Sequence, residues 1–232
     1  MRKTYVKSPL SENASIPRFI AMVDPDFEPE IIAVRLDAGP RKHLYDQCYL
    51  VVREKVERDG GSMQLGWMII ETEIVLQAVH HAVWVPPNNP EGLIDVTPKE
   101  HMKQARIMFA MDNRIEYQDN DIPSFRVNRT NESVVDDYIV FLKASEIVMA
   151  QGWYTSAMGF NLNEPLRSMF LKWRQLNEEY KKFISGYSKP KDPCLCGSSK
   201  TYADCHGRDA HSLFAAELER VGLSLDWTPL GK

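Results

Sequence analysis

The feature that most constrains the fold of this chain is a cluster of metal-binding residue types near its end. The stretch CLCGSSKTYADCHG, residues 194–207, contains three of the four cysteines in 232 residues, together with a histidine. Cys194 and Cys196 are two positions apart, Cys205 and His206 are adjacent, and eight residues separate the two pairs. Two thiolates from one tight turn and a Cys-His pair from a second can close a tetrahedron around Zn²⁺. The spacing therefore predicts that this segment folds around a metal ion.

A disulfide is the alternative use of these cysteines. A bridge between Cys194 and Cys196 would be strained because only one residue lies between them. A fragment of this size also buries too little apolar surface to fold without a cross-link or a bound metal. Gly197 allows its backbone to turn back, as a metal-binding loop requires. We therefore expect Cys194, Cys196, Cys205 and His206 to hold Zn²⁺, although such ligands do not by themselves distinguish Zn²⁺ from Fe²⁺.

This stretch resembles the SEC-C motif, the zinc-binding tail of the SecA preprotein-translocase motor that also ends many otherwise unrelated bacterial proteins. The family pattern is Cys-x-Cys-Gly-Ser-Gly-Lys-Lys-Tyr-Lys-x-Cys followed by His or Cys. Ser199 stands where the family has glycine, and Thr201 and Ala203 stand where it has lysine. The resemblance implies zinc binding and docking on a protein partner such as the SecB chaperone or the ribosome. The matching positions are Cys194, Cys196, Gly197, Ser198, Lys200, Tyr202, Cys205 and His206.

Composition excludes several other classes of protein. The 28 basic and 32 acidic residues give a net charge of -4, so nothing suggests a nucleic-acid binder, which needs an excess of Lys and Arg. No apolar stretch approaches the ~20 residues that cross a bilayer. The amino terminus, MRKTYVKSPLSEN, is basic but lacks the apolar segment of a secretory signal. With clustered, reduced cysteines, we expect a cytoplasmic protein, of an oligomeric state that the sequence leaves open.

The hydrophobic pattern predicts an α+β fold with a central antiparallel sheet and flanking helices. Residues 1–40 are mostly extended, and a helix from about residue 41 ends at Gly60 and Gly61. The long run GWMIIETEIVLQAVHHAVWV is rich in β-branched and aromatic residues and predicts two strands. Further strands are expected in IIAVRL, GLIDVT, ARIMFAM and SFRVN, and further helices over 131–151, 165–186 and HSLFAAELERVGL.

Changes in this pattern predict three regions. Residues 1–152 form the α+β main domain with its extended amino-terminal segment, and 153–186 form a helical connector. Residues 187–232 form the zinc-binding tail, which begins with the Pro- and Lys-containing linker YSKPKDP.

Cys48 is the remaining thiol, and it precedes a histidine and an aspartate in the order that cysteine enzymes use. His81 lies in HHAVW and Asp95 in LIDVT. This order resembles transglutaminase-like and papain-type enzymes, and the resemblance implies a hydrolase or acyl-transferase with a transglutaminase-like fold. In such a triad the imidazole takes the thiol proton, and the carboxylate fixes the imidazole tautomer. The predicted catalytic residues are Cys48, His81 and Asp95.

Strand alternation favours His81 over His80 in this triad, because His81 shares a face with a row of valines, which is the expected core face. A simpler interpretation is that Cys48 is a small buried apolar residue in the middle of a helix. In that case Asp95 caps a turn through its neighbouring backbone. Two classes of function therefore stay open: a cysteine hydrolase with a recruiting zinc tail, and a non-enzymatic adaptor that presents the same domain as a binding surface.

Overall fold

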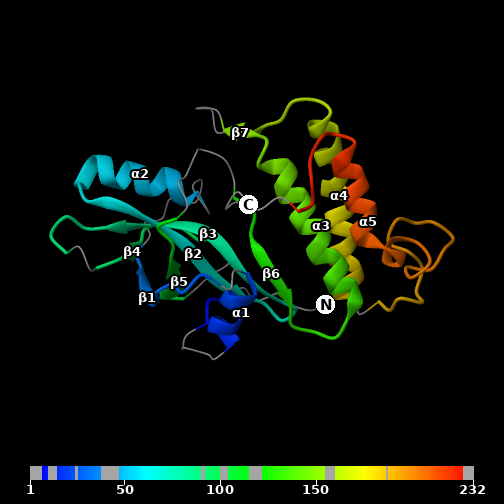
Figure 1. Cartoon of the computed structure of the whole chain (residues 1–232), viewed down its shortest axis with the longest axis horizontal. Helices are drawn as coiled ribbons and strands as arrows, with labels where there is room; N and C mark the ends of the chain where they lie inside the picture. Colours follow the sequence, from blue (N-terminus) through cyan, green and yellow to red (C-terminus); the bar gives the residue numbers. More distant parts are fainter. Residues whose placement is uncertain are drawn as a thin grey trace. The chain divides into compact units, whose positions relative to one another are not determined.

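A computed structural model describes the chain over residues 7–9, 15–23, 26–37, 47–89, 92–99, 104–114, 122–154, 160–186 and 188–226. It divides into two compact units. Residues Thr4–Glu116 form one, which we call the barrel unit, and Tyr117–Lys232 with Met1–Lys3 form the other, which we call the helical unit. Each unit is described by itself, and Figure 1 labels its helices and strands.

The strands of the barrel unit close on one another (Figure 1). Strand β2 pairs with β3 and β5, β1 pairs with β5 and β4, and β4 pairs with β3, which completes the ring. The β1–β4 pair is parallel and the other pairs are antiparallel. The strands are β1 (Ile31–Leu36), β2 (Ser62–Glu71), β3 (Val75–Val85), β4 (Ile94–Asp95) and β5 (Arg106–Met111).

Alternation along β3 sends its side chains to two separate clusters. Val83 belongs to an apolar cluster with Phe109 of β5, and Val79 packs against it. Ala82 and Trp84 belong to a second cluster, which is covered by helix α2 (Cys48–Asp59). Both faces of the strand are thus buried, as its nearly continuous run of apolar residues requires.

Two short features complete the barrel unit. Helix α1 (Ser15–Val23) buries Ile16, Phe19 and Ile20, which recur at helical spacing. A glycine pair ends α2 and starts β2. At Gly61 the backbone has φ +87°, and an added Cβ would lie 2.1 Å from a carbonyl oxygen of β3, so no other residue fits this turn.

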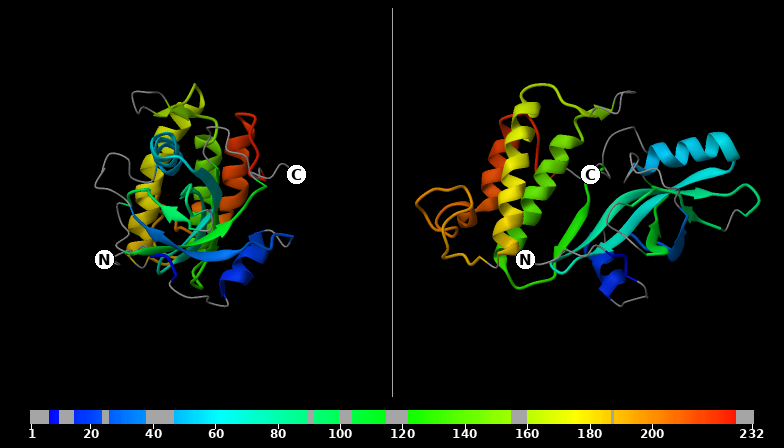
Figure 2. Two further views of the ribbon diagram at one scale, coloured as in Figure 1. Left: turned by 90° about the vertical axis from the view of Figure 1, so that its left-hand side faces the viewer. Right: turned by 180° about the vertical axis from the view of Figure 1, so that it is seen from behind.

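In the helical unit, α3 (Ser133–Met149) packs against α4 (Leu166–Ser185) and α5 (Ala210–Glu219). Figure 2 shows these helices side by side in both of its views. Phe141 of α3 lies at their shared core, with ring centroids 6.0 Å from Trp173 and 5.4 Å from Phe214. Shorter elements of this unit are β6 (Phe125–Asn128), β7 (Trp153–Tyr154), β8 (Phe160–Asn161) and the 3₁₀ helix η2 (His206–Arg208).

The α+β class is confirmed, and the predicted strands and later helices are present, but two features of the architecture differ from the prediction. Helix α1 lies in the amino-terminal stretch that was expected to be extended. Residues 41–46, where the helix before Gly60 was expected to begin, lie outside the described residues. The sheet is a small closed barrel with one parallel pair, not an open antiparallel sheet. Along the chain, the division between the two compact units falls between residues 116 and 117, and α3 packs against α4 and α5 of the helical unit. No helix within the described ranges is long and apolar enough to cross a membrane.

Candidate metal centre

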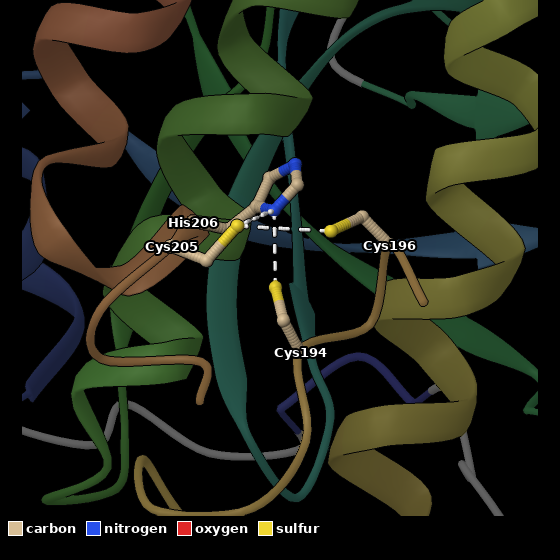
Figure 3. Close-up of side chains that lie close together, drawn as sticks. All are labelled: Cys194, Cys196, Cys205 and His206. Carbon is tan, nitrogen blue, oxygen red and sulfur yellow. Dashed lines mark hydrogen bonds between the residues drawn. The ribbon is translucent and has the colours of Figure 1, made fainter. Parts of the chain in front are cut away.

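The four predicted ligands converge on one point (Figure 3). Their ligand atoms all lie within 4.8 Å of one another. Cys194 Sγ is 3.2 Å from His206 Nδ1, and Cys196 Sγ is 3.7 Å from Cys205 Sγ. Bonds of about 2.3 Å to sulfur and about 2.0 Å to nitrogen place the ligand atoms of tetrahedral zinc about 3.5–3.8 Å apart. The donor set and its spacing therefore fit Zn²⁺, with Nδ1 as the histidine ligand atom.

Two tight turns bring the ligands together. In the first, the amide of Gly197 donates to the carbonyl of Cys194 at 3.0 Å, and Gly197 has φ +74°, which favours glycine. In the second, the amides of Cys205 and Gly207 both donate to the carbonyl of Tyr202, at 3.1 and 2.8 Å. The prediction that Gly197 turns the backbone is confirmed, and backbone hydrogen bonds define both turns.

The thiols of the site have unequal surroundings. A hydrogen bond from Ser198 is the main reason that the pKa of Cys196 is lowered to about 7. Burial raises the pKa of Cys194 to about 11 and lowers the pKa of His206. Metal binding requires thiolates and a neutral imidazole, so the shifts at Cys196 and His206 favour it and burial of Cys194 opposes it. A divalent cation in contact with Cys194 would reverse that effect.

Tyr202 fixes the ligand loop to the helices of the same unit. It is buried, its ring centroid lies 4.9 Å from that of Phe183 on α4, and its hydroxyl donates to Asp137 Oδ2 of α3 at 2.7 Å. The predicted linker is also bonded to the loop, since the amide of Tyr202 donates to the carbonyl of Asp192 and the amide of Ala203 to that of Pro190. The loop is therefore part of the helical unit and not a freely tethered tail.

The second ligand pair leads directly into a capped helix. His206 begins η2, and Asp209 then caps α5 by accepting a hydrogen bond from the amide of Ser212 at 3.0 Å. Glu217, further along α5, accepts from Trp173 Nε1 of α4 at 2.8 Å. The position of the Cys205-His206 pair is thus tied to the packing of α5.

The structure brings two of the three predicted catalytic residues together. His81 Nε2 lies 3.1 Å from Asp95 Oδ2, and both side chains are buried. Lys99 Nζ is also 3.1 Å from Asp95 Oδ2. Burial and Lys99 lower the pKa of His81, but Asp95 and Cys48 raise it, and the net effect is a pKa above its ordinary value. The charges of His81 and Lys99 likewise outweigh burial and lower the pKa of Asp95.

Cys48 lies in a different cluster. It is the first residue of α2, preceded by Gln47 in a non-helical conformation, so it is not in the middle of the helix. Its neighbours include Ala82 and Trp84, on the face of β3 opposite to His81. No hydrogen bond between Cys48 and His81 is found among the described residues, although the two interact electrostatically. The catalytic triad stays a hypothesis.

Two residues near these sites were not predicted. Lys99 follows Asp95 by four positions with no regular element between them, so the sequence carries no signal that it turns inward. Asp137 is one of several acids on α3, and only the docking of Tyr202 distinguishes it. In the simpler interpretation, Asp95 caps a turn through its neighbouring backbone. The structure contains this cap, because Asp95 Oδ1 accepts a hydrogen bond from the amide of Thr97 at 2.9 Å.

Residues 191–208 match the SEC-C motif, which agrees with the resemblance inferred from the cysteine spacing. Comparison with curated proteins and with solved structures gave no match. The resemblance of the barrel unit to transglutaminase-like enzymes therefore has no support from a homologue or from a known fold.

Proposed function

We propose that residues 191–208 form a zinc-stabilised module through which this protein is recruited to a protein partner. The observation that supports it is the convergence of three cysteines and one histidine within 4.8 Å in a segment that matches the SEC-C motif. All four positions carry ligands and none is left open for a substrate, which is the pattern of a structural zinc site. The role of the ion is then to stabilise the conformation of a surface loop.

The surface that the ion would hold is the tip of the first turn. Residues 196–200 are exposed, and Lys200 is the charged residue among them. Tyr202, two positions further on, anchors this tip to the helices. Binding to a partner should therefore depend on the metal and on the tip, but not on the barrel unit.

The resemblance to the SEC-C family makes the SecB chaperone and the ribosome the first partners to test. Co-sedimentation with ribosomes and titration with purified chaperone should be measured for the zinc-loaded protein, the chelator-treated protein and the variant Lys200→Glu. The matched control is Lys181→Glu, an exposed lysine on α4. Binding that chelation and Lys200→Glu both weaken supports the proposal. Equal binding by all four samples, or none to either partner, would contradict it.

Catalysis by the barrel unit is the second candidate, and the specific observation in its favour is the buried His81–Asp95 pair. An activated Cys48 should react with iodoacetamide at pH 7 in the folded protein, as peptide mapping by mass spectrometry would show. Labelling only after unfolding would leave the adaptor as the function.

A further inference from the structure

The metal centre places a pair of accessible thiols at the surface of the helical unit. Cys196 Sγ lies 3.7 Å from Cys205 Sγ, and Figure 3 shows the two side chains pointing toward one another. Cys196 is exposed and Cys205 is half-buried, whereas Cys194 is buried. A thiol must be accessible to react with an oxidant in solution, so this outer pair is the part of the site that an oxidant can reach.

The backbone around Cys196 allows the two sulfurs to close. The amide of Cys194 donates to the carbonyl of Lys200 at 3.0 Å, which holds the two ends of the tip together. The tip itself is exposed, and a Cβ added to Gly197 would meet no atom within 4 Å. A disulfide needs sulfurs about 2.05 Å apart, so Cys196 has to approach Cys205 by less than about 2 Å. A small movement of the open tip is enough for this approach.

The other disulfides that the site could form are less favourable. A bridge between Cys194 and Cys196 would be strained, because only one residue lies between them. A bridge between Cys194 and Cys205 would use a thiol that is 4% exposed and that lies 3.2 Å from His206 Nδ1. Access and geometry therefore both favour the pair of Cys196 and Cys205.

We propose that Cys196 and Cys205 are a site of reversible oxidation, at which hydrogen peroxide converts the two thiolates to a disulfide. The sulfur of Cys196 attacks one peroxide oxygen, the O–O bond breaks, and a sulfenic acid forms while the other oxygen takes up a proton and leaves as water. The sulfur of Cys205 then attacks the sulfenic sulfur, the S–S bond forms, and hydroxide leaves and is protonated to water. The two sulfurs together lose two electrons, and the peroxide gains them.

Oxidation and metal binding compete for the same two sulfurs, because a disulfide sulfur is no longer a thiolate ligand. The effect should extend beyond the loop. The amide of Cys205 donates to the carbonyl of Tyr202, whose side chain is bonded to α3 and packs against α4. The helical unit should therefore lose stability when the disulfide forms. This site needs no partner protein, so it can exist whether or not the proposed recruitment is correct.

Peptide mapping of the zinc-loaded protein after treatment with hydrogen peroxide tests the pairing. Free thiols are first alkylated, and trypsin is then used without a reductant. It separates residues 192–200, which contain Cys194 and Cys196, from residues 201–208, which contain Cys205. The proposed disulfide joins these two peptides, whereas a bridge between Cys194 and Cys196 stays within the first. Fragmentation of the joined peptides identifies the bonded cysteine, and a colorimetric chelator measures the released zinc.

Peroxide should join the two peptides through Cys196 and Cys205 and should release about one equivalent of zinc for each disulfide. Cys194 should stay free for alkylation, and dithiothreitol with added zinc should restore the metal site. Cys194→Ser should still give the joined peptides, because it keeps the outer pair, and Cys205→Ser should not. Cys48→Ser is the matched control and should behave as the wild type does.

Three results would overturn the proposal. The first is a wild-type disulfide formed through Cys194 or Cys48. The second is zinc release through irreversible sulfinic acid without any disulfide. The third is a protein that keeps both its zinc and its thiols at peroxide concentrations that fully oxidise free glutathione. If Cys194→Ser does not fold, the fragment spectra of the wild type decide.

Discussion

The hydroxyl of Tyr202 in the ligand loop donates a 2.7 Å hydrogen bond to Asp137 Oδ2 of α3. Tyr202 is 1% exposed, and its carbonyl accepts the amides of Cys205 and Gly207. One residue therefore connects the turn that carries two metal ligands to the core of the helical unit. Stability of the metal site and stability of the helices should consequently change together.

Loss of a metal ligand should lower the stability of the helical unit. Cys205→Ser removes one thiolate, so bound zinc should fall from about one equivalent per chain to a small fraction, as elemental analysis of protein purified without chelator would show. The free energy of unfolding of the helical unit should fall as the zinc is lost. The decrease should be at most about 10–16 kcal/mol, the free energy that zinc supplies to small modules. Cys48→Ser is the control and should retain the metal. Zinc retained by Cys205→Ser would show that this thiolate is not a ligand.

Removal of the Tyr202 hydroxyl should cost about 1–2 kcal/mol in the helical unit, because Asp137 loses its donor in a half-buried position. Tyr202→Phe keeps the ring on Phe183 and should keep the zinc content unchanged. Asp137→Ala is the partner variant for a double-mutant cycle with Tyr202→Phe. Chemical denaturation of the zinc-loaded proteins should show a loss for each single variant and a smaller further loss when the two are combined. Fully additive losses would mean that the bond to Asp137 carries no energy.

The metal site and most of the secondary structure could be read from the sequence because both depend on local signals, whereas helix α1 (Ser15–Val23) was missed in a stretch expected to be extended. The spacing of Cys194 to His206 defines a ligand set without reference to the rest of the chain. Barrel closure depends on pairings between distant strands, such as Arg35 with Ile94, and no local pattern encodes these. The docking of Tyr202 is similar, because a tyrosine in a polar loop carries no sign of its burial against α3.

The adjacent histidines of β3 should give stability opposite dependences on pH. Burial lowers the pKa of His80 to about 4, so between about pH 4 and 6.5 the unfolded chain binds the extra proton and stability rises with pH. The pKa of His81 is raised, so its stabilisation is complete below about pH 6.5 and is lost as pH rises through the folded-state value. The curve of unfolding free energy against pH therefore has an acidic limb, set by His80, and an alkaline limb, set by His81. Along each limb the free energy of unfolding changes by up to about 1.4 kcal/mol per pH unit.

Urea unfolding of the barrel unit at pH 5 to 9 would test both limbs. His80→Gln should flatten the acidic limb, and His81→Gln should flatten the alkaline one. The comparison stays above pH 5 because Asp95, whose pKa is lowered, loses its own stabilisation only in more acidic solution. A variant that keeps the wild-type slope on its own limb would show that the histidine concerned does not change its protonation on folding.

Gly207→Ala should disturb the metal site without touching a ligand. A Cβ at this position would lie 2.3 Å from Cε1 of Tyr202, so the tyrosine ring or the loop must move. We expect a loss of about 1–3 kcal/mol in the helical unit, as for other overpacked sites, and faster removal of zinc by chelator. Gly197→Ala is the contrast, because its added Cβ meets no atom within 4 Å and the cost comes from φ +74° alone. Faster zinc removal from Gly197→Ala than from Gly207→Ala would contradict this assignment.

The unequal exposure of Cys194 and Cys196 determines how the ion can be exchanged. Cys194 is 4% exposed, beneath the turn that its own carbonyl closes, while Cys196 is exposed at the tip. A competing thiol or chelator therefore reaches a bound ion more readily from the side of Cys196 than from the side of Cys194. The tip proposed to contact a partner is then also the side from which the ion is most easily removed.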